Sequence, residues 1–295
     1  MGFSIVEEDW CSDSGRTSKT IHMKIGYVCT NFNNSLFTLK AVETLFSNPG
    51  YAYEVVVVDN NSGEDDVALL KRLNERWPKV EIIYCDSNLG YFRGLNVGIQ
   101  ALRERHRDVE WIIVGNNDLE FPTDFSAKLA HALPRLRECP VVSPDVVTVE
   151  GEHQNPHVIS SISPMREIFY DLYYSNYLVG LLIQRLARLF PGLSERRDEE
   201  QWRIARFIYQ GHGSCYLLGP RFFEVFRDLW APTFLMSEEF FLSKQLSDKG
   251  FKVYYEPAIT VIHHWHGSLA KVASRQRWGF AREAHREYRK YVRWF

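Results

Sequence analysis

The stretch Trp111-Ile-Ile-Val-Gly-Asn-Asn-Asp-Leu-Glu-Phe121 decides the fold class. It begins with four apolar residues and runs straight into two amides and a carboxylate. A continuous apolar run of this length, ending at Gly115, is typical of a strand that is buried on both faces of a sheet. Ligands of such α/β sheets bind where the strands end. Asn116, Asn117 and Asp118 are therefore candidates for ligand contacts, although the same residue types also favour simple turns.

Three further strand-like runs end in polar residues in the same way. Residues 24–30 lead into Asn31, residues 54–59 into Asn60-Asn61-Ser62-Gly63, and residues 80–85 into Asp86-Ser87-Asn88-Leu89-Gly90. Segments with helical spacing separate these strands, at residues 35–46, 65–77 and 94–105. This alternation predicts an α/β fold with a mostly parallel central sheet flanked by helices. Right-handed crossovers would bring the four polar strand ends to one edge of the sheet.

The composition is that of an ordinary soluble protein, with 45% hydrophobic and 24% charged residues. The formal net charge of −2 argues against a protein built mainly to bind nucleic acid. The five cysteines are scattered without the spacing of a metal or disulfide site, which suits a reducing cytosol. The sequence contains neither an apolar run of about 18 residues nor a secretion signal, so we expect a cytoplasmic protein.

The expected domain layout has three parts. Residues 1–20 are polar and acidic, and we interpret them as a flexible N-terminal tail. Residues 21–268 would form the main domain, in which we expect a long helix over 166–190 and strands on either side of Pro257. Residues 269–295 are basic and amphipathic, which predicts a C-terminal helical extension.

Two segments suggest binding of a nucleotide or another anion. The carboxylate of Asp59, at a strand end, can accept the imide N–H of uracil or thymine, while a helix N-cap or a turn is the competing interpretation. Residues 88–96 combine Gly90 and Arg93 with the amides of Asn88 and Asn96 just before a helix. Glycines let a backbone approach a ligand, and a helix N-terminus beside an arginine favours an anion. A purely structural loop fits this segment equally well.

Carboxylates and histidines suggest a metal ion and a general base. Asp118 offers a hard oxygen ligand for Mg²⁺ or Mn²⁺, and the cluster His263-His264-Trp265-His266 offers nitrogen, which favours Mn²⁺. Glu238 and Glu239 open a predicted helix, where acids complement the helix dipole, and either one is alternatively a general base. Adjacent residues point about 100° apart on a helix, so we expect at most one of them to face the site.

Five motifs in order carry a resemblance to a known family. They are Asp59-Asn-Asn-Ser, Asn88-Leu-Gly-Tyr, Asn116-Asn-Asp118, Glu238-Glu239 and the segment from His263 to Ser268. Together they resemble family 2 glycosyltransferases over residues 24–268, and the bacterial rhamnosyltransferase-like branch most of all. The resemblance implies a GT-A (Rossmann-like) fold, a nucleotide-sugar donor, Mn²⁺ or Mg²⁺ as cofactor, and inversion at the anomeric carbon. It also implies a nucleotide-sugar half over residues 21–125 and an acceptor half over residues 126–268.

The resemblance implies roles for single residues as well. Asp59 would hold the pyrimidine base. Further residues expected in the nucleotide-sugar site are Thr30, Asn31, Asn61, Asn88, Gly90, Arg93, Asn96 and Asn117. Asp118 matches the last residue of the family's Asp-x-Asp metal motif, and His263 matches the histidine that reaches the metal or the diphosphate. His264 is an alternative metal ligand, because alternate residues of a strand face opposite sides.

The match to the family's catalytic motifs has two departures. Glu239 stands where the family has an aspartate as its base, and the extra methylene leaves Glu238 as an alternative base. Asn116 replaces the first acid of the metal motif and removes one charge. The resemblance thus implies catalytic roles for Glu239 or Glu238 and a metal site with fewer carboxylates than usual.

From the resemblance we expect an inverting glycosyltransferase of cell-surface polysaccharide synthesis. It would move a sugar from dTDP-rhamnose or a UDP-sugar to a hydroxyl of a glycan or a lipid-linked acceptor. The alternatives are a nucleotidyltransferase that forms a nucleotide-sugar and a non-catalytic sugar-nucleotide-binding protein.

The basic C-terminal segment bears on where the protein acts. It interleaves arginines and lysines with aromatic residues, a pattern that suits an anionic membrane surface such as the inner face of the plasma membrane. The competing interpretation is a helix that packs on the domain, or on a second subunit in a homo-oligomer.

Overall fold

The computed structural model describes residues 24–189, 198–264 and 274–292. The expected N-terminal tail lies outside these residues, as do Trp265, His266 and Ser268 of the histidine segment. No helix within the three described ranges is long and apolar enough to cross a lipid bilayer.

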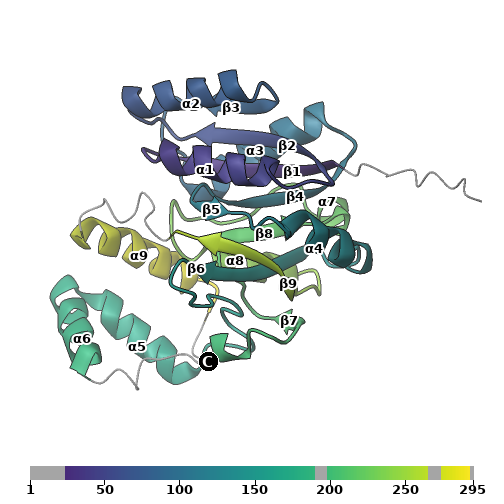
Figure 1. Ribbon diagram of the computed structural model, residues 1–295. Coiled ribbons are helices and arrows are strands. Elements are labelled where there is room, and N and C mark those ends of the chain that lie inside the picture. The colour runs from purple at the N-terminus through teal and green to yellow at the C-terminus, as the bar shows by residue number, and fades with distance from the viewer. Residues whose placement is uncertain (1–23, 190–197, 265–273, 293–295) are drawn as a thin grey trace, which may run out of the picture.

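The first half of the chain alternates strands and helices as expected. Its strands are β1 (Lys24–Asn31), β2 (Ala52–Asp59), β3 (Val80–Tyr84) and β4 (Val109–Asn116), and its helices are α1 (Ser35–Phe46), α2 (Glu64–Arg76) and α3 (Tyr91–Arg105). All four strands are parallel, in the order β3-β2-β1-β4 (Figure 1). Because helical crossovers connect them, their carboxyl ends meet at one edge of the sheet.

The second half extends the same sheet beyond β4. It contributes β5 (Leu119–Glu120), β6 (Val141–Thr148), β7 (Arg206–Ile208), β8 (Cys215–Leu218) and β9 (Val253–His263). Strand β8 pairs antiparallel with both β4 and β6, whereas β9 runs parallel to β6. Strands β5 and β7 are antiparallel to β9. Six of the nine strands (β1, β2, β3, β4, β6 and β9) thus share one direction, which confirms the mostly parallel sheet.

Helices cover both faces of this sheet (Figure 1). Helices α1, α2 and α4 (Phe125–Ala132) enclose a core with Tyr27 and Val57 on one face. Helices α3, α7 (Pro220–Val225) and α8 (Glu238–Ser247) enclose a second core with Val28 and Val58 on the other. Successive strand residues therefore point into different cores, as the pleat requires. The arrangement confirms the α/β fold class.

Three elements differ from the expectation. The single helix expected over 166–190 is a pair, α5 (Pro164–Ser175) and α6 (Tyr177–Leu189), because Asn176 between them has an extended backbone. The two strands expected around Pro257 are one strand, β9, whose pairing with β6 skips residues 257–259. The C-terminal helix, α9 (Ser274–Tyr288), ends seven residues before position 295. Helix α9 lies beside the left-hand end of the sheet in Figure 1.

Gly98 sets how closely α3 packs on the sheet. A Cβ atom at this position would lie 2.4 Å from Val28 Cγ1 and 2.9 Å from Val58 Cγ2, and both valines are buried. Both distances are too short for a side chain, so glycine brings α3 closer to β1 and β2 than any other residue would.

We expect Gly98→Ala to lower the free energy of unfolding by about 1–3 kcal/mol, because the added methyl group overpacks the contact between α3 and the sheet. Gly279→Ala in α9 is the matched control, since nothing lies within 4 Å of its added Cβ. Alanine there favours the helix by up to about 1 kcal/mol. Chemical denaturation measures both variants. An unchanged or higher stability of Gly98→Ala would contradict the tight contact.

Candidate active site

A buried hydrogen-bond network joins the carboxyl ends of β1, β2 and β4. The Nδ2 atom of Asn31 donates to Asp59 Oδ1 at 2.9 Å, and Asn117 Nδ2 donates to Asn31 Oδ1 at 3.0 Å. Thr38 of α1 donates to Asn31 Oδ1 and accepts from Asn117 Nδ2, both at 2.8 Å. All four side chains are buried. A satisfied network of this kind fixes one arrangement of the strand ends, because each broken bond would leave a buried polar atom unpaired.

The Asp59 carboxylate serves this network and the turn that follows it. Besides Asn31, it accepts the Ser62 N–H at 3.1 Å and the Ser62 hydroxyl at 2.5 Å. Asp59 is 1% exposed and is not among the residues that line the nearby crevice. Asp118 and Glu239 line that crevice without Asp59, so the base-binding role implied for Asp59 stays a prediction. Its neighbour Asn60 lines the crevice in its place.

The crevice itself has a volume of about 630 Å³ and lies where β1 and β4 end. Nine of the residues expected to contact ligands or to act in catalysis line it: Thr30, Asn88, Gly90, Asn116, Asn117, Asp118, Glu238, Glu239 and His263. They come from both halves of the chain. The fold thus brings the two predicted acids of α8 to the same hollow as the end of β4.

Asp118 and His263 face each other in this crevice. Asp118 is 2% exposed, and its Oδ1 atom lacks a hydrogen-bond partner among the described residues. His263 Nε2 lies 3.4 Å from that oxygen. Its Nδ1 lies 2.8 Å from Gln154 Oε1, and Asn116 Nδ2 lies 3.2 Å from Nε2. With the ring proton on Nδ1, facing Gln154 Oε1, Nε2 is the acceptor atom that lies near both Asn116 Nδ2 and Asp118 Oδ1.

Two acceptor atoms that face each other in a buried site repel unless a cation or a proton lies between them. A carboxylate oxygen and an imidazole nitrogen are both ligands for Mn²⁺. Asp118 and His263 therefore fit a divalent metal as a two-ligand site. In the part of the chain that the structure describes, no group of three or more His, Cys, Asp or Glu residues could hold a metal.

His264 lies outside the crevice. Its backbone N–H donates to Asp118 O at 3.0 Å, and its Nε2 lies 2.8 Å from Glu120 Oε2 and 3.3 Å from Lys40 Nζ. Because alternate residues of β9 face opposite sides, His264 points away from the carboxylate that His263 faces. The alternative assignment of His264 as a ligand of the Asp118 metal is therefore wrong.

Four other residues expected in the nucleotide-sugar site do not line the crevice. Asn31 is committed to the buried network, and Asn61 lies exposed in the turn after β2 with a positive φ of 64°. Asn96 both donates to and accepts from the backbone of Leu229, at 2.8 and 2.9 Å. Arg93 is exposed on α3 and does not line the crevice. Asn31 and Asn96 thus bond to the protein itself, whereas Asn61 and Arg93 are exposed.

Gly90 lies in close contact with another segment of the protein's own backbone. Its φ is +83°, and a Cβ atom would lie 2.1 Å from Phe234 O. The N–H of Tyr91 donates to that same carbonyl at 3.2 Å. The close approach expected for a ligand is therefore made by the loop before α8, which closes one side of the crevice.

The two acids of α8 both line the crevice, contrary to the expectation that only one would face it. Met236 and Ser237, just before the helix, both have positive φ angles, of 75° and 63°. Such strained turns cluster at functional sites. Glu238 is 7% exposed, and burial together with the negative charge of Glu239 raises the pKa of Glu238 to about 8.

The loop after β7 is a part of the site that the sequence analysis did not identify. His212, Gly213 and Ser214 line the crevice, and the His212 ring lies 5.7 Å from that of His263. Gly213 N–H donates to Glu239 Oε1 at 3.2 Å, and a Cβ on Gly213 would lie 2.5 Å from that oxygen. Burial lowers the pKa of His212 well below its ordinary value, so its ring is neutral. In the sequence, the two glycines on either side of His212 were the signal that could have identified this loop as part of the site.

Helix α9 is the second unforeseen part of the site. Its residues Gln276, Arg277 and Phe280 line the crevice. The Phe280 ring lies 5.6 Å from that of Phe234, and Tyr288 packs against Phe240 at 4.4 Å between ring centroids. The described part of the basic C-terminal segment therefore packs on the domain, which was one of its two interpretations.

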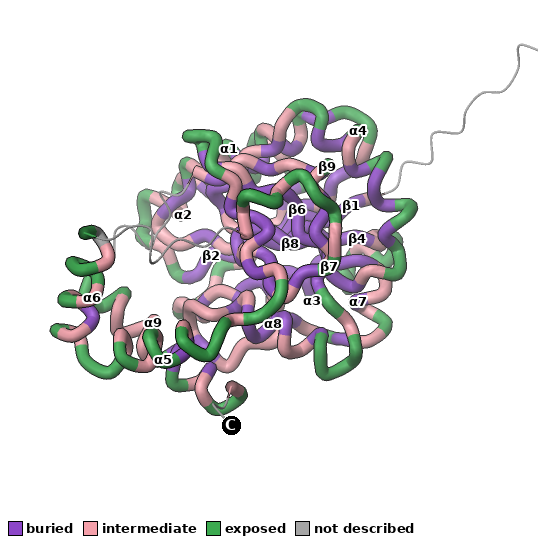
Figure 2. The backbone as a smooth tube through the Cα atoms, turned by 90° about the horizontal axis from the view of Figure 1, so that it is seen from below, coloured by how far each residue is buried: buried purple, intermediate pink, exposed green. Residues whose placement is uncertain are grey.

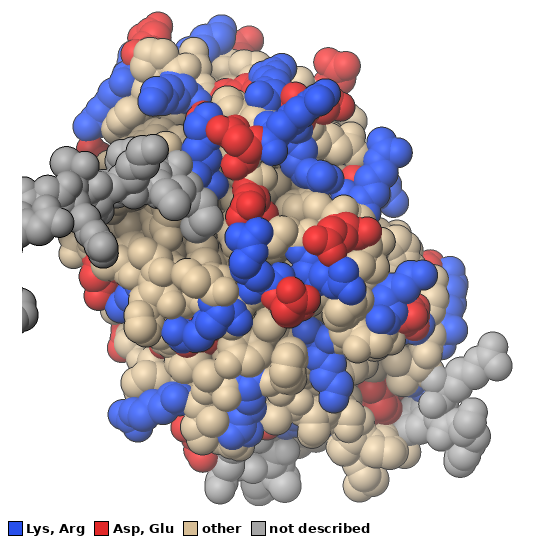
Figure 3. Space-filling view, turned by 90° about the vertical axis from the view of Figure 1, so that its right-hand side faces the viewer, with Lys and Arg blue, Asp and Glu red and all other residues tan. Residues whose placement is uncertain are grey.

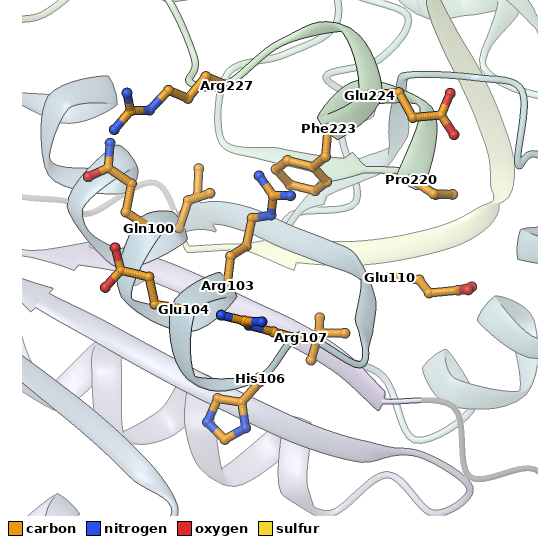
Figure 4. Close-up of a pocket in the computed structure, with 12 residues that line it drawn as sticks. Gln100, Arg103, Glu104, His106, Arg107, Glu110, Pro220, Phe223, Glu224 and Arg227 are labelled. Atoms are coloured by element: carbon orange, nitrogen blue, oxygen red, sulfur yellow. The ribbon is translucent and has the colours of Figure 1, made fainter.

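A second hollow of about 640 Å³ lies between α3 and α7 (Figure 4). Arg103 stacks over Phe223 there, with its guanidinium carbon 4.2 Å from the ring centroid. Two of its acids, Glu110 and Glu224, pair with Arg137 and Arg221. The described side chains around it include none of the buried atoms that lack a hydrogen-bond partner. We assign the chemistry to the crevice at the strand ends instead.

Comparisons with known proteins agree with this fold. The sequence model described as "Glycosyl transferase family 2" matches residues 28–183. The "Succinoglycan biosynthesis protein ExoO" of Rhizobium meliloti (strain 1021) is 28% identical over 128 residues, which are 43% of this chain and 35% of that protein. The chain thus spans about a third of the length of this curated relative.

Two solved structures share the fold. A mannosyltransferase from Pyrobaculum calidifontis, in complex with GDP-Man and Mn²⁺, matches with a TM-score of 0.51 at 16% identity. The match covers 84% of this chain and 59% of the mannosyltransferase chain. GalNAc-T7 with UDP, GalNAc and Mn²⁺ matches with a TM-score of 0.54 at 14% identity. This match covers 84% of this chain and 45% of the GalNAc-T7 chain. At these identities the likeness shows the fold alone.

The raised pKa of Glu238 makes stability depend on pH. Between about pH 4.5 and 8 the folded chain keeps a proton that the unfolded chain releases, so the free energy of unfolding falls as pH rises. We expect Glu238→Gln to remove this fall and to be more stable than wild type by about 2–4 kcal/mol at pH 8. Denaturation of both proteins from pH 5 to 8 measures the difference. Parallel pH profiles would contradict the buried, protonated state.

Proposed function

The chain belongs to glycosyl transferase family 2, and from this premise we propose that its crevice binds a nucleoside diphosphate sugar and transfers the sugar with inversion. The observation that carries the proposal is the pairing of Asp118 with His263 in the same crevice as Glu238 and Glu239. The mannosyltransferase and GalNAc-T7 structures contain GDP-Man or UDP together with Mn²⁺, which supports a donor of this class.

Asp118 Oδ1 and His263 Nε2 would hold Mn²⁺ or Mg²⁺, with diphosphate oxygens completing its coordination. A metal bound there would supply positive charge to the departing diphosphate. The Gln154 contact to Nδ1 orients the His263 ring, as second partners of ligating histidines do. Asn116, which stands where the family has an acid, has its Nδ2 atom 3.2 Å from His263 Nε2.

Arg277 is a second source of positive charge. It is the one Lys or Arg among the described residues that line the crevice, which also has the carboxylates of Asp118, Glu238 and Glu239. A diphosphate that enters beside these acids needs cations nearby, because like charges in a partly buried site repel strongly. We therefore propose Arg277 for the anion-binding role expected of Arg93.

Glu239 is the proposed general base. Gly213 N–H holds its Oε1 atom, whereas the more buried Glu238 keeps its proton near neutral pH. Two adjacent carboxyl groups that share one proton leave one of them as a base. Glu239 would take the proton of an acceptor hydroxyl as the hydroxyl oxygen bonds to the anomeric carbon. The bond from that carbon to the diphosphate breaks on the opposite face, which inverts the centre.

The donor would be dTDP-rhamnose or a UDP-sugar, with its nucleoside near Thr30, Asn60 and Asn88, which line one part of the crevice. The proposed acceptor is a hydroxyl of a glycan or lipid-linked sugar in cell-surface polysaccharide synthesis. The name of the Rhizobium relative, a succinoglycan biosynthesis protein, supports this setting. A non-catalytic nucleotide-sugar-binding protein is the second candidate, because Asn116 stands in for an acid.

We expect Glu239→Gln to lower kcat by about 10²–10⁴-fold, the usual contribution of a general base, while UDP binding is retained. Glu238→Gln should cost far less, because glutamine resembles the protonated carboxyl group. Donor hydrolysis and sugar transfer with Mn²⁺ measure both variants. Loss of activity in Glu238→Gln with a near wild-type Glu239→Gln would reverse the assignment. A wild type that binds UDP-sugars but never cleaves them would establish the non-catalytic candidate.

UDP binding should distinguish the two proposed sources of positive charge, the metal on Asp118 and the Arg277 side chain. We expect Asp118→Asn to abolish the gain in UDP affinity that Mn²⁺ provides. Arg277→Gln should keep this gain but weaken UDP binding by about tenfold both with and without Mn²⁺, since it removes one charge-assisted hydrogen bond. Calorimetric titration of UDP with and without Mn²⁺ measures both effects. Equal Mn²⁺ dependence in wild type and Asp118→Asn would exclude the proposed metal site.

A further inference from the structure

The helical pair α5–α6 carries an exposed apolar face. Eight of its large hydrophobic side chains are between 44% and 79% exposed: Met165, Ile168, Phe169, Leu172, Leu178, Leu182, Leu186 and Leu189. They are more than half of the fourteen exposed large hydrophobic residues among the described parts of the chain. Their spacing of three or four places them on one stripe of each helix. Scattered apolar residues are ordinary on a surface, but a concentrated face marks an interaction site.

The opposite side of α5 is attached to α9 by polar contacts. Glu167 accepts from the Tyr288 hydroxyl and lies 3.3 Å from Arg289 Nη1. Asp171 lies 2.6 Å from His285 Nε2 and 3.1 Å from Arg289 Nη2. Glu167 and Asp171 are the two acids in residues 164–189. Both are therefore paired with α9, and the apolar face contains no carboxylate.

The remaining polar groups of the pair match a lipid interface. Arg185 is exposed between Leu182 and Leu186 and carries positive charge beside the stripe. Tyr174 and Tyr177 lie away from this stripe, against His285 and Trp278 of α9. Arginine beside an apolar stripe without carboxylates is typical of helices that lie in the headgroup region of an anionic bilayer. Helices of 12 and 13 residues are too short to span a bilayer.

The pair also projects from the body of the protein. Figure 2 shows α5 and α6 on one side of the sheet domain, next to α9, with much of α6 coloured as exposed. The face at the right of Figure 1 differs, because basic and acidic side chains are interspersed there (Figure 3). Helix α9, on which the pair rests, contributes Arg277 and Phe280 to the crevice. A surface bound by the pair would therefore lie near the active site.

We propose that the α5–α6 face docks on an anionic lipid bilayer and presents the crevice to an acceptor at the membrane surface. The role of the crevice rests on the proposed function, whereas docking by itself does not. The proposal moves the membrane contact from the C-terminal helix, whose described part packs on the domain, to a pair of helices in the middle of the chain.

Sedimentation of the full chain with lipid vesicles tests the proposal. We expect binding to vesicles of phosphatidylcholine with about a third phosphatidylglycerol, and weaker binding to phosphatidylcholine alone. The triple variant Leu178→Gln/Leu182→Gln/Leu186→Gln should lose at least tenfold in the partition coefficient, because its apolar face no longer inserts. The matched control is Leu36→Gln/Val149→Gln/Ile204→Gln, which changes three exposed apolar residues elsewhere and should bind as wild type does.

A second variant guards against a folding defect in α6. Phe169→Gln/Leu172→Gln alters the same face from α5, and it should also weaken vesicle binding while thermal unfolding stays at the wild-type temperature. The proposal would be overturned if wild type did not bind vesicles, or if both face variants bound them as strongly as wild type does. Light scattering tests whether a second copy of the chain occupies this face instead. If wild type is a dimer, both face variants are monomers and no vesicle binding is found, the face would be assigned to a second copy.

Mn²⁺-dependent UDP binding, measured without vesicles, separates this proposal from the proposed function. Both face variants should keep wild-type UDP affinity, since the changed residues are outside the crevice. Vesicle binding without UDP binding would overturn the proposed function and leave the docking surface standing. UDP binding without vesicle binding would do the reverse.

Discussion

The hydrogen bonds among Asn31, Asp59 and Asn117 hold together the carboxyl ends of three parallel strands. Parallel strands alone bring their ends to one edge, but they do not set how those ends are spaced. Here each strand contributes one buried polar side chain, and Thr38 joins the group to α1. Asp118 directly follows Asn117, so the position of the carboxylate that faces His263 depends on this network. Residues that resemble a nucleotide-binding motif therefore include some that support the site without lining it.

Charge is the second constraint on the crevice. Three carboxylates line it together with Arg277, and the polar network beneath them is neutral apart from Asp59. A buried site cannot keep this much negative charge without compensation. Two features reduce it: Glu238 keeps a proton, and Asp118 lies 3.4 Å from His263 Nε2, where we propose a bound cation. The site is thereby suited to a ligand that brings its own negative charge together with a divalent ion.

The walls of the crevice come from segments far apart in the chain. The loop before α8 reaches across to Gly90, the loop after β7 holds Glu239 through Gly213, and α9 closes a third side. Gly90 is needed because a Cβ atom there would collide with the backbone oxygen of Phe234, whereas a Cβ atom at Gly213 would displace the Glu239 carboxylate. These contacts explain why the second half of the sheet, with its antiparallel strand β8, belongs to the same site as the parallel first half.

The sequence by itself determined the α/β class and the parallel first half, because buried strands and their polar ends leave a local pattern. It offered Asp118, His263 and the two glutamates as candidates through their side-chain chemistry and the family resemblance of their motifs. It did not separate Asn31, Asp59 and Asn96, whose side chains bond to the protein itself, from Thr30 and Asn88, which line the crevice. It also missed His212 and Arg277, and it extended one helix through Asn176. Only the tertiary structure decided these points, since the direction of a side chain depends on which distant segment packs against it.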